Sequence, residues 1–271
     1  MKHNILLDGA AGTTLWALAE AAGVAKVPTW RYNIEHPEFV RELHRQYIAA
    51  GSRMIQTNTF DANRLSVERA SDYTVTEVVT AAVRLAKEAV AGTDVKVYLS
   101  AGPLAVLMEP YGKVTRAQVR EIYDEMVSAA VRAGVDAVLL ETFMDVRMLA
   151  EAAQVAKGYG VPVFCSMTFA KRHRTMMGDS VQKIVETLTP LGVDAVGMNC
   201  SAGPVEALEI IREFRTATEL PLFYKPNAGM GESYSAAQFA AEVAPALPLV
   251  TYVGGCCGCD ASYIREIGKL L

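Results

Sequence analysis

Short apolar runs recur along the chain, and segments with apolar residues at helical spacing separate them. The runs predict eight strands, at residues 4–8, 53–58, 95–100, 136–141, 162–168, 194–199, 221–225 and 249–254. Helical spacing predicts helices at 74–91, 115–133, 145–157 and 204–218, with two more segments near 12–22 and 37–50 in a long first connection. Most strands are almost continuously apolar, which is typical of parallel strands covered on both faces. The alternation of strand and helix therefore favours an α/β fold.

Helix-end signals support these boundaries. Thr115 and Asp145 precede two of the predicted helices and are suitable N-caps, and Pro204 suits the first turn of a third. Gly134 and Gly192 each end a helical segment and lead into an apolar run, as glycine at a helix C-terminus commonly does. The 271 residues show no linker or break in composition, and α/β barrels commonly have about 250 residues. We therefore expect one domain, residues 1–271, that forms a single (β/α)8 TIM barrel with an elaborated first βα connection.

Composition narrows the class of protein. Hydrophobic residues make up 51% and charged residues 21%, as in ordinary globular proteins. The net charge of −4 argues against a nucleic-acid partner, and no run approaches the ~18 apolar residues of a membrane helix. Asp8 comes too early for a signal peptide, and an odd number of cysteines, two of them adjacent, argues against a disulfide framework. These features predict a cytoplasmic location, with neither nucleic acid nor membrane as a partner.

Polar or special residues gather where the predicted strands end. They are Asp8-Gly9, Asn58-Thr59, Gly102-Pro103, Glu141-Thr142, Met167-Thr168, Asn199-Cys200, Lys225-Pro226-Asn227 and the run from Gly254 to Cys257. In (β/α)8 barrels the active site lies at the C-terminal ends of the strands. The opposite strand ends carry nothing comparable, so the pattern predicts a functional site at one mouth of the barrel.

Three cysteines stand out at these strand ends. Cys256 and Cys257 are adjacent within a glycine-rich run, and Cys200 follows the sixth strand. Three thiolates that converge at one mouth would form a zinc site with one position left for a substrate, and soft thiolates favour zinc over magnesium or calcium. The alternative is that they are small buried hydrophobic residues. For Cys165, inside the fifth strand, and Cys259, at a helix start, we expect packing roles.

Two carboxylates and a glycine-rich turn are further candidates. Asp8 opens the turn Asp8-Gly9-Ala10-Ala11-Gly12-Thr13, whose backbone N–H groups could bind an anion such as a carboxylate; a tight turn capped by Asp8 is the alternative. The turn lacks the G-x-G-x-x-G spacing of a dinucleotide site. Glu141 follows an apolar strand and would be a ligand group at the mouth or a helix cap. Asn58 would contact substrate or only shape its loop.

Several ordered motifs together resemble one family, the zinc-dependent homocysteine S-methyltransferases. They are residues 8–13, Gln56-Thr57-Asn58-Thr59-Phe60, Leu140-Glu141-Thr142, Gly197-Met198-Asn199-Cys200-Ser201, Lys225-Pro226-Asn227-Ala228-Gly229 and Gly254-Gly255-Cys256-Cys257-Gly258. The segments Trp30 to Asn33, His36-Pro37-Glu38 and Arg174 to Asp179 are most similar to the homocysteine-binding module of cobalamin-dependent methionine synthase. The resemblance runs from about residue 5 to 268.

The resemblance implies a metal site and an acceptor. Zinc would be bound by Cys200, Cys256 and Cys257, with the sulfur of L-homocysteine as fourth ligand. Before the substrate arrives, the side-chain oxygen of Asn227 would take that position. The zinc-bound thiolate would then attack an activated methyl group directly and yield methionine, which makes the chain a homocysteine S-methyltransferase.

The resemblance also implies a set of substrate contacts. Asp8 and Glu141 would hold the ammonium of homocysteine. Backbone N–H groups around Gly9, Ala10 and Ala11, and those of the turn from Asn199 to Ser201, would bind its carboxylate. Asn58 and Thr59 would contribute at the mouth.

The methyl donor and two other functions stay open at this point. The similarity to methionine synthase favours methylcobalamin or another methylcorrinoid, carried by a separate corrinoid-binding protein because the chain ends soon after the metal motif. S-methylmethionine and S-adenosylmethionine are alternative donors. Lys225 at a strand end could instead form a Schiff base, as in an aldolase. The barrel could also be a non-catalytic zinc- or corrinoid-protein-binding scaffold.

Overall fold

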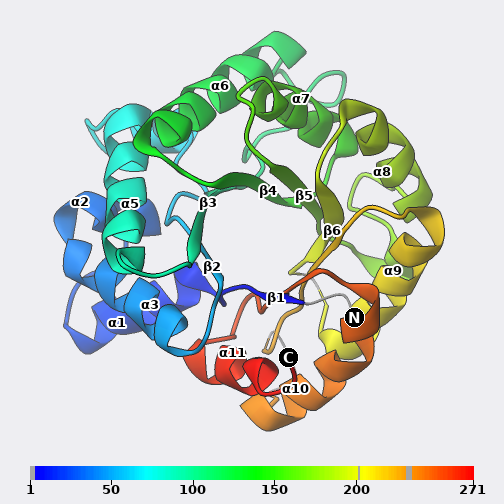
Figure 1. Cartoon of the computed structure of the whole chain (residues 1–271). Coiled ribbons are helices and arrows are strands. Elements are labelled where there is room, and N and C mark those ends of the chain that lie inside the picture. Colours follow the sequence, from blue (N-terminus) through cyan, green and yellow to red (C-terminus); the bar gives the residue numbers. More distant parts are fainter. Residues whose placement is uncertain (1–3, 201, 230–233) are drawn as a thin grey trace.

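Eight parallel strands form a nearly closed barrel in the computed structural model, which describes residues 4–200, 202–229 and 234–271 (Figure 1). The strands are β1 (Ile5–Leu6), β2 (Met54–Gln56), β3 (Lys96–Ala101), β4 (Ala137–Phe143), β5 (Val163–Met167), β6 (Ala195–Asn199), β7 (Leu222–Lys225) and β8 (Tyr252–Val253). Their order is β1-β8-β7-β6-β5-β4-β3-β2. The N–H of Arg53 donates to the carbonyl of Leu6 across the remaining seam, at 2.7 Å. The predicted (β/α)8 barrel is confirmed, and each predicted strand is present.

Helices surround the barrel. They are α1 (Ala11–Ala21), α2 (Tyr32–Glu35), α3 (Pro37–Ala49), α4 (Arg64–Ala70), α5 (Val75–Val90), α6 (Arg116–Ala133), α7 (Val146–Lys157), α8 (Val181–Leu188), α9 (Pro204–Ala217), α10 (Ala236–Val243) and α11 (Ala261–Gly268). The first connection holds α1, α2 and α3, which lie together outside β1 and β2 as the predicted elaboration (Figure 1). Within the described ranges, none of these helices is long and apolar enough to cross a membrane.

The predicted helix-end signals act as expected. The side chain of Thr115 accepts a hydrogen bond from the backbone of Gln118, and the Gln118 side chain bonds back to the Thr115 N–H, forming a capping box. Asp145 caps α7 with its side chain, and Pro204 lies in the first turn of α9. Gly134 ends α6 with a φ of 96°, a left-handed conformation that glycine adopts without strain. Local sequence therefore fixes where these helices begin and end.

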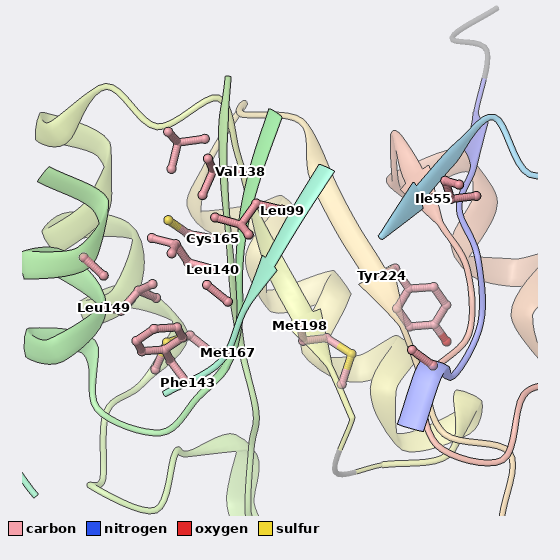
Figure 2. Packing of buried hydrophobic residues seen from close by; sticks show 14 of the residues in the cluster. Ile55, Leu99, Val138, Leu140, Phe143, Leu149, Cys165, Met167, Met198 and Tyr224 are labelled. Atoms are coloured by element: carbon pink, nitrogen blue, oxygen red, sulfur yellow. The ribbon is translucent and has the colours of Figure 1, made fainter. Parts of the chain in front are cut away.

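Two apolar cores lie on the two sides of the sheet. The inner core fills the barrel and consists of Leu7, Met54, Tyr98, Ala137, Leu139, Phe164, Ala195 and Phe223. The outer core lies between the sheet and the helices; Figure 2 shows Leu149 of α7 on the same side of β4 as Leu140 and Phe143. Cys165 belongs to this outer core, as expected (Figure 2). Because side chains fill the barrel, ligands have access only to the loops at its ends.

His44 on α3 is fully buried, and within the described part of the chain neither of its ring nitrogens has a hydrogen-bond partner. Burial lowers the pKa of His44 from 6.5 to about 4, although the nearby Asp8 carboxylate opposes the shift. Between pH 6.5 and about pH 4, His44 is therefore protonated in the unfolded chain but neutral in the folded protein. We expect this residue to cost about 3 kcal/mol of stability as the pH falls through that window, and nothing above it.

The measurement is urea unfolding of wild type and His44→Leu between pH 7 and pH 4. The free energy of unfolding of the variant should fall less steeply with decreasing pH than that of wild type. Equal slopes in wild type and His44→Leu would contradict the assignment.

Candidate active site

A cavity of about 440 Å³ opens where the strands end. Residues that end or follow β1, β2, β4, β6, β7 and β8 line it, and they include Gly9, Gln56, Glu141, Cys200, Lys225, Cys256 and Cys257. Its volume lies within the range of about 300–1,000 Å³ typical of small-molecule sites. The C-terminal mouth of the barrel is therefore the candidate active site, as the strand-end residues predict.

The three predicted cysteines converge on this cavity. The sulfur atoms of Cys200, Cys256 and Cys257 all lie within 4.8 Å of one another, and the Sγ atoms of Cys200 and Cys257 are 3.7 Å apart. Cys200 has a φ of 63°, a left-handed conformation that is uncommon outside glycine and that occurs here where the chain leaves β6. The hydrogen bond with Cys200 is the main cause that raises the pKa of the Cys257 thiol to about 11. Three crowded thiolates need a cation, so the cluster could hold a metal ion.

Asn227 follows β7, and its role as a fourth metal ligand stays a prediction. Its Oδ1 atom is buried and has no hydrogen-bond partner among the residues that the structure describes. Its backbone N–H donates to the carbonyl of Ala202 at 2.9 Å, and the next N–H, of Ala228, donates to the carbonyl of Cys257 at 2.9 Å. Asn227 is thus tied to both segments that carry the cysteines. A buried acceptor without a donor is costly, and a cation beside it would remove that cost. The donor set therefore fits zinc.

Asp8 and Lys225 form a buried ion pair beside the cavity. The Nζ atom of Lys225 lies 2.9 Å from Oδ1 of Asp8, and both side chains are almost fully buried, at 1% and 2% exposure. Lys225 also donates to Oε1 of Gln56 at 3.0 Å. Burial acts to lower the pKa of Lys225, but the carboxylates of Asp8 and Glu141 outweigh it and raise the pKa. Lys225 is therefore held as a cation.

Glu141 lies on the cavity wall at the end of β4 and is 4% exposed. The hydroxyl of Ser100 donates to its Oε1 atom, and the side-chain amide of Asn199 lies 3.3 Å from its Oε2 atom. Burial is the main cause that raises the pKa of Glu141, and Lys225 opposes it. The side chain of Asn199 is held in place by further hydrogen bonds. Its Oδ1 atom accepts from the Thr142 N–H at 2.8 Å and from the Ser166 hydroxyl at 2.7 Å.

Asn58 and Thr59 line the cavity but also hold their own loop. The amide of Asn58 donates to the Thr29 carbonyl at 2.7 Å and to Oδ1 of Asn33 at 3.0 Å. The hydroxyl of Thr59 donates to the Ser100 carbonyl at 2.7 Å. These bonds shape the mouth, and a direct contact with substrate stays a prediction for both residues.

The backbone N–H groups predicted to bind a carboxylate differ in availability. The N–H of Ala10 donates to the carbonyl of Cys259 at 2.9 Å, and that of Cys200 donates to the carbonyl of Lys225 at 3.0 Å, so both are engaged. Ser201 lies outside the described residues. Helix α1 begins at Ala11 without a side-chain cap, and its first turn lines the cavity. An uncapped helix N-terminus presents free N–H groups and favours an anion.

Comparison with known proteins decides the family. The family model described as homocysteine S-methyltransferase matches residues 5–271. The chain belongs to this family. The resemblance seen in the sequence motifs is thereby confirmed.

Individual relatives of this family are similar to different extents. Methionine synthase of Mycobacterium tuberculosis is 30% identical over 265 residues, which cover 87% of this chain and 22% of that protein. Betaine–homocysteine S-methyltransferase 1 of Bos taurus is 25% identical over 288 residues, or 93% of this chain and 69% of that protein. The chain thus spans about a fifth of the length of the mycobacterial methionine synthases it matches. The metallated form of the homocysteine methyltransferase MmuM from Escherichia coli shares the fold, with a TM-score of 0.82 at 23% identity over 99% of this chain and 96% of that one.

Cys259 has a packing role in this family member, as expected. It is fully buried just before α11, and its carbonyl accepts hydrogen bonds from the Ala10 N–H at 2.9 Å and the Tyr47 hydroxyl at 3.0 Å. A Cβ atom at Gly255 would lie 2.4 Å from the Cβ of Cys259. Cys259 therefore joins the turn after β1 to the segment that carries Cys256 and Cys257.

Gly9 is the point where these two segments touch. A Cβ atom there would lie 2.2 Å from the carbonyl oxygen of Cys259 and 2.8 Å from the hydroxyl of Tyr47. We expect Gly9→Ala to force the segments apart, to destabilise the fold by about 1–3 kcal/mol and to weaken metal binding. Gly12→Ala is the matched stability control, because a Cβ atom at Gly12 meets no described atom within 4 Å. Thermal unfolding and metal titration would check this, and equal melting temperatures for the two variants would contradict it.

Sequence reasoning missed the network around Asp8. Tyr98 lies in the middle of β3, and its hydroxyl donates to Oδ1 of Asp8 at 2.6 Å. The backbone N–H of Gln56 donates to Oδ2 of Asp8 at 2.7 Å. The sequence does show a tyrosine inside an apolar strand, Tyr98, and a lysine at the end of a strand, Lys225. Neither residue indicates that its side chain would contact Asp8.

Proposed function

We propose that this chain transfers a methyl group to the thiol of L-homocysteine and so produces methionine. The observation that carries the proposal is the grouping of three cysteine sulfurs at a cavity that Glu141 and the N-terminus of α1 also line. These features match the three polar ends of homocysteine: a thiol, an ammonium and a carboxylate. Membership of the homocysteine S-methyltransferase family supports the same acceptor.

Cys200, Cys256 and Cys257 would hold a zinc ion, with the Oδ1 atom of Asn227 completing the site in the absence of substrate. A free thiol, with a pKa near 8.5, is only a few per cent thiolate at pH 7, and the thiolate is the nucleophile. When bound, zinc would supply the positive charge that keeps the acceptor sulfur deprotonated. The first turn of α1 would bind the acceptor's carboxylate, and Glu141 would bind its ammonium. All five cysteines are free, which suits a reducing compartment such as the cytoplasm.

For the methyl donor we propose methylcobalamin or another methylcorrinoid, presented by a separate corrinoid-binding protein. The similarity of Trp30 to Asn33, His36-Pro37-Glu38 and Arg174 to Asp179 to the homocysteine-binding module of cobalamin-dependent methionine synthase supports this choice. S-methylmethionine and S-adenosylmethionine are the alternative donors, and the test below separates them.

The Schiff-base alternative is disfavoured by the state of Lys225. A nucleophilic lysine must be a neutral amine with a lowered pKa. Here the Asp8 carboxylate at 2.9 Å helps raise the pKa of Lys225. Borohydride should therefore trap no carbonyl compound on this residue. The alternative of a non-catalytic scaffold is also disfavoured, because all three predicted cysteines and Glu141 lie at one cavity.

The function is tested by incubating zinc-loaded protein with L-homocysteine and, in separate reactions, methylcobalamin, S-methylmethionine or S-adenosylmethionine. We expect methionine from methylcobalamin, and none from the Cys257→Ser variant. Methionine only from a sulfonium donor would overturn the donor assignment and keep the acceptor. No methionine from any free donor, although homocysteine binds, would mean that a dedicated corrinoid-binding protein must present the methyl group. A zinc-loaded protein that binds no homocysteine would favour the scaffold.

A further inference from the structure

One side-chain amide, that of Asn199 at the end of β6, joins the end of β4 to the cysteine cluster. Asn199 is fully buried. Its Oδ1 atom accepts from the N–H of Thr142 at 2.8 Å and from the hydroxyl of Ser166 at 2.7 Å. An amide nitrogen cannot accept these bonds, so the two donors fix which end of the amide is the oxygen. The NH2 group of Asn199 therefore has a fixed direction.

That NH2 group points toward the cavity and the cysteines. The Nδ2 atom lies 2.7 Å from Oγ1 of Thr142, 3.3 Å from Oε2 of Glu141 and 3.8 Å from Sγ of Cys256. Of its two hydrogens, one is taken by the short contact with Thr142, and the other is left for Glu141 and Cys256. A thiol sulfur is a weak acceptor, but a metal ligand must be a thiolate, whose charge strengthens the hydrogen bond.

The end of β4 is irregular, and Asn199 holds it. The register with β5 shifts between Leu140 and Phe143, and both of these side chains belong to the outer core although they are three positions apart (Figure 2). Both residues between them, Glu141 and Thr142, line the cavity, whereas a regular strand would turn only one of them inward.

The backbone of Thr142 is strained at this point. Its φ of 64° is an outlier for a β-branched residue, and such a conformation persists only where its surroundings hold it. The Asn199 side chain holds Thr142 at two points, because it accepts from the N–H and donates to the hydroxyl. Strained residues held in this way are concentrated at functional sites, which suggests that the position of the Asn199 amide matters for the chemistry.

We propose that Asn199 is a positioning residue for the metal centre, whose amide, held by the end of β4, donates an N–H to the Cys256 thiolate. Such a bond orients the sulfur and withdraws electron density from it, as hydrogen bonds to other metal ligands do. The inference rests on the proposed function, because it takes the three cysteines as the metal site.

The test replaces zinc by Co²⁺, which absorbs light when charge moves from a bound thiolate to the metal. Loss of a hydrogen bond to the sulfur makes this transfer easier and moves the absorption band to longer wavelength. Asn199→Asp keeps an acceptor for Thr142 and Ser166 but loses the N–H groups. Asn199→Leu removes the amide without adding charge. We expect a shift to longer wavelength in both variants, and a dissociation constant for Co²⁺ that rises by about 10–100-fold.

Ser166→Ala is the matched control. It removes a hydrogen bond to Oδ1 of Asn199 but leaves the NH2 group in place, so its band should coincide with that of wild type. An unchanged band in either Asn199 variant that folds would overturn the inference. An equal shift in Ser166→Ala would overturn it as well, because the effect would then come from general loosening of the site.

The measurement needs neither homocysteine nor a methyl donor, and this separates the inference from the proposed function. A wild-type protein that binds no Co²⁺ contradicts the metal site, and the function and the inference fail together. A wild-type protein that shows the thiolate band, with the same band in the Asn199 variants, contradicts the inference and leaves the function intact.

Discussion

Replacing Cys257 by serine is expected to reduce bound zinc from about one ion per chain to less than about a tenth, because a weak hydroxyl ligand replaces one of three thiolates. Methionine formation should fall by at least about a thousandfold, equal to about 4 kcal/mol of activation free energy. Mass spectrometry of the metal and a methionine assay measure the two effects. Cys200→Ser and Cys256→Ser should behave alike, since the three sulfurs lie within 4.8 Å of one another.

Cys259→Ser is the matched control for this prediction. Cys259 belongs to the same loop but is buried against Gly255 and is not part of the three-cysteine cluster. The control should retain its zinc and differ from wild type mainly in stability. Equal zinc contents in Cys257→Ser and Cys259→Ser would show that the cluster is not the metal site.

Replacing Lys225 by methionine is expected to destabilise the protein by about 3–5 kcal/mol. The substitution keeps most of the length of the side chain but leaves the buried Asp8 carboxylate without its cation. Removing one partner of a buried ion pair costs far more than the net contribution of the pair, because the remaining charge is buried and uncompensated. Urea unfolding should show a lower midpoint with an unchanged slope.

Two comparisons define the cause of that loss. Asp8→Asn/Lys225→Met removes both charges and should recover most of the stability. Lys26→Met removes the lysine of another ion pair, to Glu20, with the same distance of 2.9 Å, but the two side chains are 58% and 70% exposed. It should leave the midpoint nearly unchanged. A similar loss for Lys26→Met and Lys225→Met would contradict the role given to burial.

The barrel could be predicted from the sequence because each of its strands is a short apolar run. Six helices were predicted as well, since their length displays the helical period over several turns. No ranges were predicted for α2, α4, α8, α10 and α11, although a helix start near Cys259 was expected, and each of these helices has eight residues or fewer. About two turns give too few apolar positions to establish a period.

The cysteine cluster could be predicted for a different reason. Cys200, Cys256 and Cys257 each follow an apolar strand, and strand ends of a parallel barrel meet at one mouth. The ion pair of Asp8 and Lys225 could not be found in this way, because it joins residues 217 positions apart, and side-chain direction decides it. Nor does any local signal indicate the left-handed conformation of two residues, Thr142 in the irregular last part of β4 and Cys200 just after β6, whose φ angles are 64° and 63°.

X-ray absorption at the zinc K edge, with and without L-homocysteine, tests the central claim most directly. With three cysteine ligands, the zinc-loaded protein should show three sulfur neighbours at about 2.3 Å and one lighter neighbour, consistent with the unpartnered Oδ1 atom of Asn227. Saturating L-homocysteine should raise the sulfur count to four and remove the lighter neighbour. A sulfur count that stays the same at saturation would contradict activation of the acceptor thiol at this site.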